Sequence, residues 1–163
     1  IFFSIYFISW IKVFNSKLFY FILIIIFFNL SSNLIWITKN HPFQNVFFNS
    51  IQKKILKKDF ELDYWGNSDI YMLKHILKLN NEKNITVAGT GYVWIKGSFG
   101  LLNYKEKSRL IDVDVYEADF IIDRNSPPYF DSKLKSHIDN NYDKYFELIV
   151  DGNIINTIYK SKK

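Results

Sequence analysis

The densest group of potentially reactive side chains lies in residues 60–66, which read Phe-Glu-Leu-Asp-Tyr-Trp-Gly. If this segment is a strand, Glu61 and Asp63 share a face, and their carboxylates could stand about 6 to 7 Å apart, a spacing suited to acid–base chemistry. Tyr64 and Trp65 could stack on a sugar ring. The simpler interpretation is that the carboxylates face solvent and that the two aromatic rings pack against the domain or the membrane.

The other candidate sites have weaker patterns. His41, His75 and His137 are dispersed and lack the spacing of metal ligands. An acidic run over residues 112–123 could hold a cation, although alternating solvent-facing strand positions explain it as well. Residues 89–91, Gly-Thr-Gly, are similar to a phosphate-binding turn but lack the full GxGxxG pattern. The chain has no Cys, which excludes disulfides and thiolate metal sites, and we predict no metal site.

The element that precedes these candidates is an uncharged stretch over residues 18–37, bounded by Lys17 and Lys39. A helix of this length is about 30 Å long, which matches the hydrocarbon core of a bilayer. Apolar residues occupy all sides of such a helix. Its polar residues cluster in the second half, at Asn29, Ser31, Ser32 and Asn33. We therefore predict a transmembrane helix.

A second apolar run, residues 1–11, indicates the end of an earlier membrane helix, so residues 1–38 read as a helical hairpin with a truncated first helix. Lys12 and Lys17 lie in its connection, and short loops that carry Lys generally stay cytoplasmic. We therefore expect the chain after Lys39 to lie on the outer face of the membrane. Because the sequence begins with Ile, we interpret the chain as a fragment; a secretory signal peptide is the alternative.

The net charge of +5 does not by itself indicate a nucleic-acid partner. From Lys39 onward the chain has nineteen basic and sixteen acidic side chains, a net charge of only +3. Its basic residues are not interleaved with aromatic residues at any recognisable spacing. We therefore expect no nucleic-acid binding.

The remainder reads as a juxtamembrane segment, residues 39–59, and an α/β domain, residues 60–163. Residues 50–58 place apolar side chains on one face of a short helix and four Lys on the other, which is either a solvated face or a basic collar on anionic lipid. Residues 60–66 are predicted as a strand. A helix over residues 69–79 follows, capped by Asn67 or Ser68.

The pattern beyond this helix is rich in strands. We predict strands at residues 84–89, 110–115 and 118–122, whereas residues 92–95 fit either a strand or the start of a helix. Residues 146–150 and 154–159 flank Asp-Gly-Asn and predict an antiparallel hairpin with an Asp-Gly or a Gly-Asn turn. The expected fold is an α/β domain of two or three layers that ends in this hairpin and follows an N-terminal transmembrane helix.

Two motifs resemble those of a known family. Residues 41–49 and 60–66, in this order behind a membrane helix, resemble His-Pro-Tyr-Gln-Tyr-Val-Tyr-Phe-Asn and Phe-Glu-Leu-Asp-Tyr-Trp-Gly of polytopic bacterial glycosyltransferases, which are similar to the dolichyl-phosphate-mannose protein mannosyltransferases. The second motif matches completely. In the first motif, Phe43, Asn45 and Phe47 each replace a Tyr. The resemblance covers residues 18–68.

This resemblance implies an integral membrane enzyme of the bacterial cell membrane that moves a sugar from a polyprenyl-phosphate carrier to an acceptor on the outer face. The carboxylates credited with catalysis in that family lie in a loop far upstream, so no catalytic residue is assigned here. The candidate substrate-binding residues are His41, Gln44, Asp63, Tyr64 and Trp65. The resemblance specifies no cofactor.

The resemblance also implies a role for the domain and its partners. We expect the domain to act as a scaffold or as an acceptor-recognition module, in contact with membrane lipid, a polyprenyl-phosphate sugar and further N-terminal membrane helices of the same chain. The alternative is a non-enzymatic, membrane-anchored binding or interaction domain outside the cytoplasm.

Overall fold

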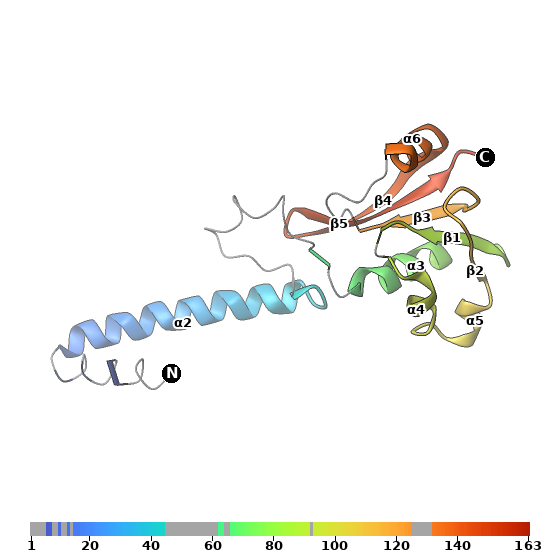
Figure 1. Ribbon diagram of the computed structural model, residues 1–163. Helices are drawn as coiled ribbons and strands as arrows, with labels where there is room; N and C mark the ends of the chain where they lie inside the picture. The colour runs from blue at the N-terminus through green and yellow to red at the C-terminus, as the bar shows by residue number, and fades with distance from the viewer. Residues whose placement is uncertain are drawn as a thin grey trace. The chain divides into compact units, whose positions relative to one another are not determined.

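The computed structural model describes residues 6–7, 10, 13, 15–44, 62–63, 66–91, 93–124 and 132–163. The chain divides into two compact units, Ile1–His41 and Pro42–Lys163. The first contains a long apolar helix and the second a small α/β domain that ends in an antiparallel hairpin (Figure 1). This confirms the predicted fold class. The helix expected at residues 50–58 lies outside the described residues.

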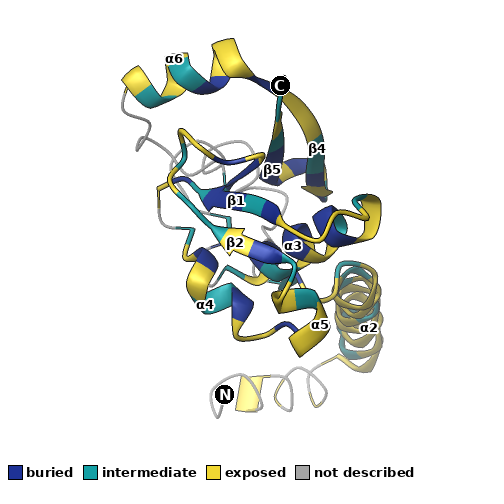
Figure 2. Ribbon diagram, turned by 90° about the vertical axis from the view of Figure 1, so that its right-hand side faces the viewer, coloured by how far each residue is buried: buried dark blue, intermediate teal, exposed yellow. Residues whose placement is uncertain are grey.

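The long helix, α2 (Ser16–Lys39), has 24 residues and begins two residues before the predicted start. It begins there because the side chain of Asn15 accepts hydrogen bonds from the backbone N–H groups of Lys17 and Leu18. None of its residues is buried (Figure 2), and most of its apolar side chains are exposed. By length and composition, α2 is able to cross a membrane.

The domain is built on a five-stranded mixed sheet with the order β2-β1-β3-β5-β4. β1 (Ile85–Gly89) pairs in parallel with β2 (Leu110–Asp112) and with β3 (Phe120–Asp123), and β5 (Asn153–Ser161) runs antiparallel to β3 and to β4 (Tyr142–Val150). β4 contains two register shifts against β5, one between Lys144 and Phe146 and one between Leu148 and Ile149.

Helices lie on both faces of this sheet (Figure 1). α3 (Asn67–Leu79) and α4 (Ile95–Phe99) cover the larger core cluster, and α6 (Ser132–Asn141) covers a smaller one on the opposite face. The alternation of strand side chains divides the two cores: Val87 lies in the larger and Ala88 in the smaller. The short α5 (Tyr104–Lys107) precedes β2. A capping box between Asn103 and Glu106 stabilises its N-terminus.

Several sequence predictions were wrong in detail. Leu62 and Asp63 form a turn rather than a strand, because the carboxylate of Asp63 folds back onto the start of α3. That helix begins at Asn67, and its N-cap is Gly66, whose φ is +68°. The strand predicted at residues 110–115 ends at Asp112.

Other local details were left open or missed. Ile95 begins a helix, which settles the choice left open at residues 92–95, although Tyr92 lies outside the described residues. α6 was not predicted, because only a few apolar residues mark its inner face, with Ile138 alone fully buried. Phe43 was assigned to the juxtamembrane segment, yet its side chain is buried in the domain core with its ring edge-on to Tyr71.

Candidate functional site

Asp63 is a predicted site residue, and it is completely buried. Its Oδ1 accepts a hydrogen bond from the backbone N–H of Asn67 at 3.0 Å, and its Oδ2 accepts from the N–H of Ser68 at 2.8 Å and from the Ser68 hydroxyl. The carboxylate thus supplies the cap that Gly66, which has no side chain, cannot supply. Its negative charge also stabilises the positive end of the helix.

A network of buried polar side chains continues from this cap. The carboxylate of Asp69 forms a two-pronged ion pair with Arg124, with 2.9 Å between Asp69 Oδ1 and Arg124 Nε. The amide of Asn156, on β5, donates to the Ser68 hydroxyl at 2.7 Å and to Asp69 Oδ1 at 3.3 Å. Burial raises the pKa of Asp69, and the Arg124 guanidinium opposes this shift. The network ties the start of α3 to β5 and to Arg124, the residue that follows β3.

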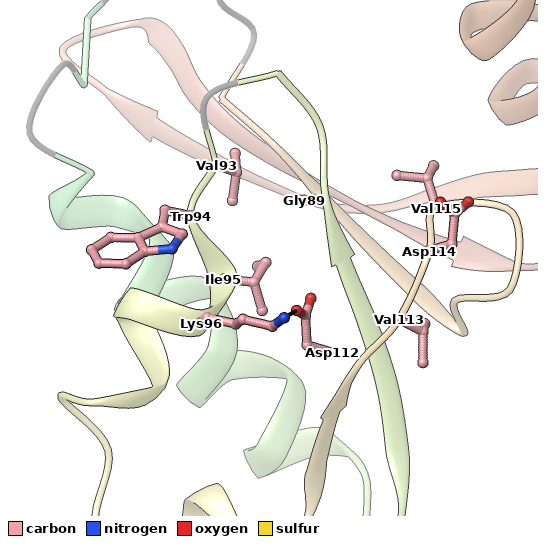
Figure 3. Close-up of a pocket in the computed structure, with 9 residues that line it drawn as sticks. All are labelled: Gly89, Val93, Trp94, Ile95, Lys96, Asp112, Val113, Asp114 and Val115. Carbon is pink, nitrogen blue, oxygen red and sulfur yellow. Dashed lines mark ion pairs between the residues drawn. The ribbon is translucent and has the colours of Figure 1, made fainter.

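A hollow of about 270 Å³ opens at a different place, at the carboxyl ends of the parallel strands β1 and β2 (Figure 3). Its lining residues are Gly89, Val93, Trp94, Ile95, Lys96, Asp112, Val113, Asp114 and Val115. The carboxyl edge of parallel strands is where open α/β sheets commonly bind ligands. The volume lies just below the roughly 300–1,000 Å³ of typical small-molecule pockets, so it suits one small ring rather than an extended ligand.

The side chains at the hollow combine a flat apolar surface with charged groups. Trp94, just before α4, has an exposed fraction of 72%. The Trp94 ring packs against Gly97. A side chain at position 97 would collide with the indole, so the ring can lie there only because residue 97 is a glycine. Lys96 reaches from α4 to Asp112 at the end of β2, with 3.7 Å between Nζ and Oδ2 (Figure 3).

The ion pair at the hollow is weak and open to solvent. The Lys96 side chain is 77% exposed, and such surface pairs contribute about 0–1 kcal/mol. The exposed Asp114 accepts a hydrogen bond from the backbone N–H of Tyr116 through one carboxylate oxygen. Carboxylates accept hydrogen bonds from hydroxyl groups, an ammonium donates them, and an indole covers an apolar ring face. The arrangement can therefore bind a small polyhydroxylated ring.

The Gly-Thr-Gly turn, residues 89–91, borders this hollow, but the polar groups of Thr90 are hydrogen-bonded to β3. The Thr90 hydroxyl donates to the buried Asp123 carboxylate, with 2.6 Å between Oγ1 and Oδ1, and the Thr90 N–H donates to the Ile122 carbonyl. These bonds fix the turn to β3. Within the described residues, no group of three or more His, Asp or Glu side chains is placed to hold a metal ion.

The structure places the predicted site residues in different settings. His41 is exposed in the turn after α2, and Gln44 is half-buried near the start of the domain. Asp63 is a buried cap, and Tyr64 and Trp65 lie outside the described residues. A substrate-binding role for all five stays a prediction.

Sequence reasoning missed the hollow as a unit. Its residues come from the undecided segment around Trp94 and from the acidic run that contains Asp112 and Asp114. The signal that could have found it was the parallel pairing of two strands, which brings their carboxyl ends to one edge. Comparison with protein-family models, curated proteins and solved structures finds no match to this chain.

Proposed function

We propose that this chain is the C-terminal part of an integral-membrane glycosyltransferase that uses a polyprenyl-phosphate-linked sugar. In this proposal α2 spans the membrane, and the domain recognises the sugar acceptor on the outer face. The motifs at residues 41–49 and 60–66 support the assignment to this enzyme class. The observation that carries the domain's role is the hollow, which the exposed Trp94 lines together with Lys96 and Asp112.

The proposed reaction is the transfer of a glycosyl group. A hydroxyl oxygen of the acceptor attacks the anomeric carbon of the donor, the bond from that carbon to the phosphate oxygen breaks, and polyprenyl phosphate leaves. A carboxylate base upstream of this chain takes the hydroxyl proton. The role of the domain is to hold the acceptor, because positioning both reactants lowers the entropic cost of the reaction.

Binding to the hollow is tested on the 163-residue chain in lipid nanodiscs, since maltoside detergents carry sugars themselves. The probes are the methyl glycosides of glucose, galactose, mannose and N-acetylglucosamine, each titrated against tryptophan fluorescence and by calorimetry. We expect binding to at least one probe that Trp94→Ala weakens about tenfold, whereas Trp94→Phe retains a stacking ring. Tyr104→Ala, which removes an aromatic ring that is 86% exposed outside the hollow, is the matched control.

Transfer is tested separately, in membranes that contain a longer chain with the upstream loop. Radiolabelled sugar on polyprenyl phosphate should appear in the acceptor, with a raised acceptor KM in Trp94→Ala. Sugar binding without any transfer would favour the alternative, a membrane-anchored binding domain, for which the compactness of Pro42–Lys163 as its own unit is the supporting observation. Equal affinities in Trp94→Ala and the unaltered chain would contradict the role given to the hollow.

A further inference from the structure

One face of α2 carries two amide side chains in a helix that is mostly apolar. Asn29 and Asn33 are four residues apart and therefore lie on the same face. Asn29 is only about 2 Å along the axis from the middle of the helix. If α2 spans a bilayer, as the proposed function requires, these amides lie in or near the most apolar layer, where polar side chains generally contact protein rather than lipid.

The two amides satisfy each other only in part. Asn33 Nδ2 donates to Asn29 Oδ1 at 3.1 Å, and the Ser32 hydroxyl donates to the Asn29 carbonyl at 2.9 Å. In the part of the chain that the structure describes, Asn29 Nδ2 and Asn33 Oδ1 make no hydrogen bond. Each helix thus offers one donor and one acceptor about one turn apart, and hydrocarbon can satisfy neither.

The surrounding spacing is that of a helix-packing seam. Ile22, Ile26, Asn29 and Asn33 are separated by four, three and four residues. This 3.5-residue repeat is the pattern of left-handed helix pairs, which is also the commonest crossing in membranes. A polar residue within such a seam fixes the register and the number of helices.

We propose that α2 pairs in parallel with α2 of a second copy of this chain, through the seam centred on Asn29 and Asn33. The donor and the acceptor make this seam self-complementary. Under twofold symmetry, Asn29 Nδ2 of each copy donates to Asn33 Oδ1 of the other, so one contact is made twice. The pairing rests on insertion of α2 into the membrane, which belongs to the proposed function.

The test measures energy transfer between copies of the full 163-residue chain in lipid vesicles. The chain has no Cys, so Ser136→Cys, on the exposed surface of α6, gives a single site for donor or acceptor dyes. Energy transfer between the dyes is measured while lipid is added to dilute the protein in the membrane. Flotation of the vesicles reports membrane insertion independently for each variant.

We expect the unaltered chain to associate, and Asn29→Leu and Asn33→Leu to weaken association by about three- to thirtyfold each, the range of interhelical hydrogen bonds in membranes. Asn29→Gln should restore part of the association because it keeps the amide. Ser31→Leu is the matched control. It also replaces a polar residue by Leu but lies about 200° around the helix from Asn29, so it should leave association unchanged.

Four outcomes overturn the proposal. The first is a chain that floats with the vesicles but shows no transfer beyond random crowding, as expected if another helix of a longer chain covers this face. The second is unchanged association in both Asn variants, and the third is an equal loss in Ser31→Leu. A chain that does not float overturns membrane insertion and this pairing together, whereas the first three outcomes leave the proposed enzyme class untouched.

Discussion

The carboxylate of Asp63 shows how a residue chosen for its chemistry can serve the fold. Its two oxygens accept bonds from Asn67 and Ser68. The motif drew attention to Asp63, but its capping role depends on the left-handed conformation of Gly66, which reverses the chain between the cap and the helix. The alternation of apolar and polar residues in residues 60–66 predicts a strand and gives no indication of this reversal.

Replacing Asp63 by Ala should destabilise the domain by about 2 to 3 kcal/mol, because the buried N–H groups of Asn67 and Ser68 lose their acceptors. Asp63→Asn should cost less, since its amide oxygen can still accept. Urea unfolding followed by circular dichroism measures the free energy. Asp143→Ala, at a carboxylate that is 77% exposed, is the control and should change the stability by less than about 0.5 kcal/mol. Equal effects at positions 63 and 143 would refute the capping role.

His75 gives the domain a predicted dependence on pH. Its ring stacks on Phe146 with 3.8 Å between centroids. Burial, and secondly the positive charge of Lys78, lower the pKa of His75 below 6.5. The unfolded chain therefore takes up a proton more readily than the folded domain, so the stability is fully present above pH 6.5 and falls as the pH drops through 6.5 toward the lowered value.

Unfolding free energies of the unaltered chain and of His75→Phe, compared at a series of pH values, should show this contribution. The substitution keeps a ring over Phe146 and removes the titrating group, so it should flatten the decrease below pH 6.5. An identical pH profile in His75→Phe would assign the decrease to other groups.

At the scale of elements, the terminal hairpin was the best-predicted feature. Val150 pairs with Asn153, which leaves Asp151 and Gly152 as a two-residue turn with φ values of +50° and +74°. The sequence Asp-Gly favours this turn because both positions need a left-handed backbone. The prediction succeeded because its signal is local.

Gly152→Ala should destabilise the domain by about 1 kcal/mol, because an alanine is strained at positive φ. Nothing lies within 4 Å of the added methyl group, so the loss would report backbone strain alone. Gly152→Asn is the control, since Asn adopts the left-handed backbone more readily than Ala. Thermal unfolding compares the two variants, and equal midpoints would contradict the strained turn.

Elements whose signals are not local were harder to predict. α6 presents Lys, Ser, Asp and Asn at most positions, so its apolar stripe is too narrow to recognise without the sheet beneath it. The ion pair of Asp69 with Arg124 joins residues 55 positions apart, and the contact of Asn156 with Ser68 spans 88. No pattern in a single sequence connects such residues before the strand order is known.

At the scale of the whole molecule, the division at residue 41 follows directly from composition. The uncharged stretch became α2, which extends two residues beyond the predicted span at each end. The hollow could not be foreseen in the same way. Its sides come from the segment after β1 and from the end of β2, and only parallel pairing makes them neighbours.

The two register shifts in β4 have a consequence for encounters between copies of the domain. β4 pairs with β5 alone in the described sheet, so its other edge has backbone groups that a foreign strand could use. The shifts interrupt the even spacing of those groups, and charged Asp143 and Lys144 stand beside them. A strand of a neighbouring domain therefore pairs poorly with the open edge of β4, which disfavours the growth of amyloid-like stacks.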